Sequence, residues 1–198
     1  MRRPTFLLRL GLGLGVTALA VVAMSVAACG GGGGGGGGPT GPPPPTSTIV
    51  FTPAGGGNVL LASGSGTQGT TLSLEVRTTG VQDLYGVAFH LAYPVAALRL
   101  TGHAEGSVLN AGGTVPTSFQ IVDSPPGNLV VGLTRLGRVA GTGAAGTLMT
   151  LQLTAAASGN GSLAFSNNVA SDSQGNVISG LTWAGGSVQV TLMPGARR

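Results

Sequence analysis

The stretch LYGVAFHLAY, residues 84–93, decides the fold because two kinds of side chain alternate along it. Tyr85, Val87, Phe89, Leu91 and Tyr93 are large and apolar or aromatic, whereas the positions between them hold two alanines, a glycine and a histidine. Successive side chains of a β-strand point to opposite faces of a sheet. The alternation therefore predicts a strand with one face in a core and the other on a flat surface of small side chains.

Short β-rich segments recur along the rest of the chain and are separated by Gly, Pro, Asn or Asp. No stretch after the N-terminal segment shows the apolar stripe of an amphipathic helix. Regularly spaced strands with turn signals are typical of a β-sandwich or jelly roll. We therefore predict an all-β, nine-stranded jelly-roll domain over residues 48–193 and a short tail at 194–198. Its strands are expected at 48–52, 71–78, 84–93, 97–103, 117–123, 128–136, 147–155, 162–166 and 186–192.

The residues before this domain predict export and a lipid anchor. A basic start is followed by an apolar run, residues 10–24, that is glycine-interrupted and shorter than the roughly 20 residues of a membrane span. The sequence VAAC at 26–29 is similar to the lipobox of bacterial lipoproteins. That resemblance implies a signal peptide at 1–28 and a lipid on Cys29, hence a protein anchored to the cell envelope at the outer membrane or cell surface. Ordinary signal cleavage that leaves Cys29 as a free thiol is the alternative.

Residues 29–47 predict a tether between the anchor and the domain. Nine glycines, 30–38, are typical of a flexible coil, and the prolines at 42–45 add a stiff, disordered segment. Charge is sparse in the domain itself, since five of the nine basic residues lie outside it. The other four basic residues nearly balance the five acidic residues, all of which lie within the domain. This near-neutral balance gives no support to nucleic-acid binding. A single cysteine also leaves the domain without a disulfide.

Five segments follow one another along the chain: GVQDLYGVAFHLAYPVAALRL (80–100), PGNLVVGLTRLG (126–137), GTLMTLQLTA (146–155), SDSQGNVI (171–178) and WAGGSVQVTL (183–192). This ordered series resembles the one in cohesin domains. One departure lies after Tyr93, where Pro94-Val95 replaces the family's usual Asp-Pro and puts the local turn in question.

The cohesin resemblance implies a nine-stranded sandwich that binds dockerin modules of other proteins through one sheet face. On this chain we expect that face on the strands at 84–93, 117–123 and 128–136 and on the loop that follows. Simple solvated strand positions are the alternative for the same residues. They are Ala88, His90, Gln120, Val122, Val130 and Thr134, followed by Arg135 and Arg138.

Other functions find less support in the residues. Carbohydrate binding needs exposed aromatic rings, and Trp183 and Tyr93 are the only plausible pair, although a core role suits both. An enzyme is not predicted, because neither His90 nor His103 belongs to a catalytic motif. The stretch GTGAAG (141–146) precedes a strand and not a helix, and SDSQGN lacks the carboxylate spacing of a calcium loop. No cofactor or metal is therefore predicted, and a purely structural surface lipoprotein remains a further alternative.

Overall fold

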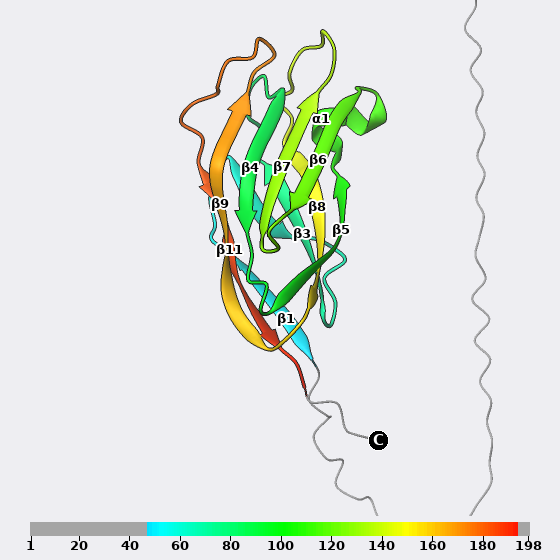
Figure 1. Ribbon diagram of the computed structural model, residues 1–198. Helices are drawn as coiled ribbons and strands as arrows, with labels where there is room; N and C mark the ends of the chain where they lie inside the picture. Colours follow the sequence, from blue (N-terminus) through cyan, green and yellow to red (C-terminus); the bar gives the residue numbers. More distant parts are fainter. Residues whose placement is uncertain (1–46, 194–198) are drawn as a thin grey trace, which may run out of the picture. The chain divides into compact units, whose positions relative to one another are not determined.

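Two β-sheets stacked face to face form the part of the chain that the computed structural model describes, residues 47–193 (Figure 1). The predicted signal peptide, Cys29, the tail and all of the linker except Ser47 lie outside these residues. The six-stranded sheet has the order β1-β11-β9-β4-β7-β6. Its strands are β1 (Thr48–Pro53), β11 (Gly186–Thr191), β9 (Gly159–Ser171), β4 (Gly86–Ala92), β7 (Asn128–Arg135) and β6 (Thr117–Asp123).

The five-stranded sheet has the order β10-β2-β3-β8-β5. Its strands are β10 (Trp183–Ala184), β2 (Val59–Ser63), β3 (Thr71–Thr78), β8 (Gly146–Ala155) and β5 (Leu98–Glu105). Neighbouring strands are antiparallel in both sheets except for the short parallel pair of β10 and β2. A one-turn helix, α1 (Ser107–Asn110), and a 3₁₀ turn, Ala111–Gly113, connect β5 to β6.

The all-β sandwich predicted from the sequence is confirmed, but the count of nine strands is wrong for the described residues, which form eleven. Each of the nine predicted segments corresponds to one strand, and β2 and β10 are the additional two. β10 has only two residues, too few to show any periodicity, and β2 is a five-residue strand next to a glycine-rich turn. β9 is also longer than predicted, because its outward polar residues interrupt the apolar pattern.

The core lies between the two sheets and follows the alternation of residues 84–93. Val87, Phe89, Leu91 and Tyr93 are buried, as the period of two predicts, whereas Tyr85 is only half-buried and its hydroxyl donates to the carbonyl of Gly137. The Phe89 ring makes an edge contact with Phe165 at a centroid distance of 5.2 Å. Leucines of β3 and β8 complete the core from the other sheet. No helix among the described residues is long and apolar enough to cross a membrane.

The ends of the domain lie together, because Thr48 of β1 is paired with Thr191 of β11. The loops at 136–145 and 172–182 project from the opposite end of the sandwich (Figure 1). The chain therefore enters and leaves the domain far from these loops.

Candidate docking face

Four neighbouring strands of the six-stranded sheet, β9, β4, β7 and β6, present their outward side chains in three rows. The register places Val169, Ala88, Gly132 and Gln120 side by side in the middle row. One neighbouring row contains His90, Val130 and Val122, and the other contains Ser171, Gly86, Thr134 and Ser118. We call these eleven residues the candidate face. Six of the eight residues predicted for partner binding belong to it: Ala88, His90, Gln120, Val122, Val130 and Thr134.

The candidate face combines exposed valines with neutral polar side chains and contains no Arg, Lys, Asp or Glu. Val122, Val130 and Val169 are 53%, 38% and 43% exposed, and His90 is the only titratable side chain in the three rows. Clustered exposed valines are unusual on a solvated surface, and the centres of protein interfaces are depleted of charged residues. The face therefore has the chemistry of a surface that another molecule covers.

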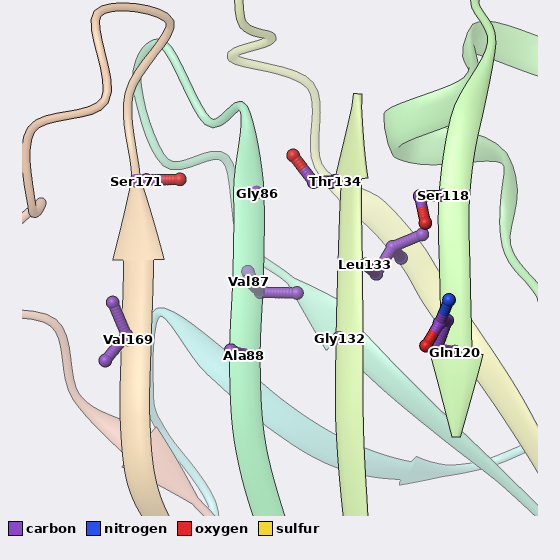
Figure 2. Close-up of a pocket in the computed structure, with 10 residues that line it drawn as sticks. All are labelled: Gly86, Val87, Ala88, Ser118, Gln120, Gly132, Leu133, Thr134, Val169 and Ser171. Carbon is purple, nitrogen blue, oxygen red and sulfur yellow. The ribbon is translucent and has the colours of Figure 1, made fainter. Parts of the chain in front are cut away.

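A hollow of about 310 Å³ lies on this face along β4 and β7 (Figure 2). Gly132 and Ala88 form its floor because they carry little or no side chain. Figure 2 shows Val169 and Gln120 standing on either side of them, on β9 and β6. The hollow is thus a trough, with a wall on each neighbouring strand.

Arg135 does not belong to the candidate face, contrary to the prediction. Its side chain is only 7% exposed, because alternation along β7 turns Thr134 outward and the following residue inward. The guanidinium donates from Nη1 to the carbonyl of Ala140 at 2.6 Å and from Nη2 to that of Val108 at 3.4 Å. Arg135 therefore holds the loop after β7 against α1 and is not available to a partner. Arg138 lies within that loop and is exposed.

Neither aromatic residue predicted as a carbohydrate contact is an open platform. Tyr93 is buried, and its hydroxyl donates to Asp123 Oδ2 at 2.6 Å. Burial, together with the hydrogen bond and the charge of Asp123, raises the pKa of Tyr93 to about 12. Trp183 is half-buried against Phe89 and Phe165, with ring centroids 5.5 and 5.3 Å away. These contacts favour the core role that the sequence already suggested for both residues.

The acidic residues at the loop end of the sandwich are engaged by protein donors. Asp83 accepts hydrogen bonds from the backbone of Gly141 and from Ser173. Asp172 accepts from the side chain and backbone of Asn176, and the side-chain bond in particular lowers the pKa of Asp172. A turn joins Ser171 to Val177, which form an isolated β-bridge, and Gly175 within it has a φ of 84°. In the described residues no group of three His, Cys, Asp or Glu side chains could hold a metal ion.

Sequence comparison finds nothing similar: no protein-family model and no curated protein matches this chain. Solved structures do match. The sixth cohesin of scaffoldin B from Acetivibrio cellulolyticus, in complex with a Cel5 dockerin mutant, is 18% identical and has a TM-score of 0.51, covering 66% of this chain and 97% of its own. The fold is that of cohesin domains.

Two further cohesins support this assignment of the fold. A type II cohesin domain from the cellulosome of Acetivibrio cellulolyticus is 16% identical, with a TM-score of 0.52 over 73% of this chain and 95% of its own. The seventh ScaB type I cohesin from Pseudobacteroides cellulosolvens is 14% identical, with a TM-score of 0.52 over 77% and 97%. At such identities the likeness concerns the fold, and function has to be argued from the face itself.

Proposed function

We propose that this chain is a non-catalytic docking module that captures a dockerin-type partner protein through the candidate face. A lipid on Cys29 and the Gly/Pro tether would hold it at the cell envelope, outside the cytoplasm, as part of a scaffold or polysaccharide-degrading assembly. The observation that carries the proposal is the uncharged, valine-rich face on a cohesin fold. One of the similar structures is itself a complex between a cohesin and a dockerin.

The physical properties of the face favour a protein partner. Three exposed valines supply apolar surface whose removal from water drives association, at roughly 25 cal/mol per Å² of buried apolar area. The surrounding Ser, Thr and Gln side chains provide the polar rim that protein interfaces need. Carbohydrate binding is less well supported, because Tyr93 is buried and Trp183 is half-buried against Phe89 and Phe165.

The position of the domain ends is compatible with display on a tether. Thr48 and Thr191 lie at one end of the sandwich, and β1 is separated from β4 by β11 and β9. The hollow begins at the first residue of β4, toward the opposite end (Figure 1). The first strand of the domain is therefore not one of the strands that form the candidate face.

The test measures binding of the purified full chain to a panel of dockerin modules from its own organism. Dockerins are calcium-dependent modules, so each is measured with calcium and after chelation. We expect at least one calcium-dependent complex, and Val122→Asp should weaken it at least about 30-fold by placing a charge next to the exposed Val130 on the candidate face. Ala104→Asp, at an exposed position of the five-stranded sheet, is the matched control and should bind normally.

Absence of binding to every dockerin in the panel would contradict the proposal. If Val122→Asp and Ala104→Asp weaken dockerin binding equally, a dockerin is still the partner, but it does not bind through the candidate face. Retention of the chain on an insoluble polysaccharide, together with no dockerin binding, would instead support the carbohydrate alternative.

A further inference from the structure

The trough in the candidate face has a floor that only small residues could form. In its middle row, Val169 and Gln120 flank Ala88 and Gly132, so the two outer strands carry side chains where the two inner strands carry almost none (Figure 2). A Cβ added to Gly132 would meet no atom within 4 Å. The space above Gly132 is therefore open to a group from outside the chain.

The walls of the trough define the chemistry of that group. None of the residues that line it is charged, so a charged group placed there would lose water without gaining a countercharge. The side chains of Ser118, Gln120 and Ser171 have no hydrogen-bond partner among the described residues and can serve polar groups at the rim. An aliphatic side chain of the partner can fill the centre of the trough without burying a charge. The partner's polar backbone around that side chain can form hydrogen bonds with the residues at the rim.

We propose that the trough receives one aliphatic side chain of the partner, of valine, isoleucine or leucine size, and that Gly132 determines which partners fit. This inference rests on the proposed docking function and adds an anchor position to it. Interfaces of this kind concentrate their energy in a few side chains that fill desolvated pockets. A residue larger than glycine at position 132 would occupy the anchor's place.

Gly132 offers a substitution that can separate binding from folding. Its φ lies outside the left-handed region and its added Cβ has free space, so Gly132→Leu should leave the fold intact. Glycine also weakens strand interiors, so the melting temperature should stay the same or rise slightly. Gly102→Leu on β5 is the matched control, because the nearest atom to its added Cβ is the Gln152 Cβ at an ordinary 3.7 Å.

The experiment measures the affinity of the full chain for the dockerin that binds most tightly in the panel above. We expect Gly132→Leu to weaken binding at least tenfold, Gly132→Ala to weaken it less, and Gly102→Leu to leave it unchanged. An alanine scan of the dockerin should then find one aliphatic position whose truncation weakens binding to the natural chain but strengthens binding to Gly132→Leu. This rescue identifies the anchor, since only a smaller partner side chain relieves the crowding.

The possible failures are distinguishable. If Gly132→Leu binds like the natural chain while Val122→Asp does not, the face is used but the trough is not, and the inference is overturned with the docking function intact. If no dockerin binds the natural chain, both are overturned. If Gly132→Leu lowers the melting temperature, Gly132→Thr provides a second variant, because a β-branched residue suits a strand. Gly132→Thr should also weaken dockerin binding.

Discussion

The outer faces of the two sheets differ in how their polar side chains are used. On the five-stranded sheet, Glu75 accepts a hydrogen bond from Thr147 Oγ1 at 3.0 Å and lies 3.7 Å from the Arg77 guanidinium. Gln152 on the same sheet donates to the Ser73 hydroxyl at 3.1 Å. On the candidate face of the six-stranded sheet, the side chains of Ser118, Gln120 and Ser171 have no such partner among the described residues, and the same face carries exposed valines.

This difference separates a surface that stabilises the domain from one that is left free to bind. Side chains that satisfy one another contribute modestly to folding and offer little to a partner. Polar side chains without a partner in the domain carry no desolvation penalty while water solvates them, and they can form hydrogen bonds with another protein. Substitutions can test that division, beginning with the core on which both surfaces depend.

The largest effect is expected from removing the core residue next to the candidate face. Phe89 is buried against Phe165 and Trp183, so Phe89→Ala should lower the free energy of unfolding by about 3–5 kcal/mol, through lost burial and the cavity left behind. Ala88→Ser, at the neighbouring outward position, should change it by less than about 0.5 kcal/mol. Urea unfolding of both variants provides the measurement. Similar values for the two would contradict the inward and outward assignment of β4.

Much of this arrangement could be predicted from the sequence, because alternation within one strand is a local property. The period of two in residues 84–93 identified the buried side of β4. The cohesin resemblance indicated which strands form the face, and alternation along them gave six of its outward residues. The prediction was wrong for Arg135, which was added to the outward residues although the alternation of β7 continues to this last residue of the strand and turns its charged side chain inward. Two backbone carbonyls accept hydrogen bonds from the buried guanidinium, whereas its Nε has no partner among the described residues.

The trough could not be predicted in the same way, because it depends on register between strands distant in sequence. Ala88 lies beside Gly132 only because β4 and β7 pair with this alignment, and a shift of one residue would place Val131 or Leu133 there. Val169 was missed since its strand, β9, was predicted to end at residue 166. Ala88 and Gly132 are far apart in the sequence, and only the pairing of β4 with β7 shows that they form one floor.

A smaller effect is expected at high pH, at the edge strand of the candidate face. The Tyr93 hydroxyl joins β4 to Asp123 of β6, and the pKa of Tyr93 is raised to about 12 from 10.0. The folded state therefore holds the phenolic proton more tightly than the unfolded chain does. The contribution of the protonated Tyr93 to the free energy of unfolding is fully present below pH 10 and is lost as the pH rises through 12. In total it is on the order of 2 kcal/mol.

The chain suits this measurement, because it has two tyrosines and no lysine. Tyrosinate absorbance in the Tyr85→Phe variant should follow Tyr93 alone, with a midpoint about 2 pH units above that of the unfolded chain. Asp123→Asn removes the carboxylate charge and should lower the midpoint. A midpoint near 10 in the folded Tyr85→Phe variant would show that the hydroxyl is not held as described.

The smallest effect compares the two outer faces directly. Glu75→Ala removes the acceptor of the Thr147 hydroxyl and the partner of Arg77, so it should lower the free energy of unfolding by about 1 kcal/mol. Gln120→Ala removes a side chain without a described partner and should change it by less than about 0.5 kcal/mol. The order should reverse for dockerin affinity, with Gln120→Ala weakening binding and Glu75→Ala leaving it unchanged. If both variants shift stability and affinity together, the division between a stabilising face and a binding face does not hold.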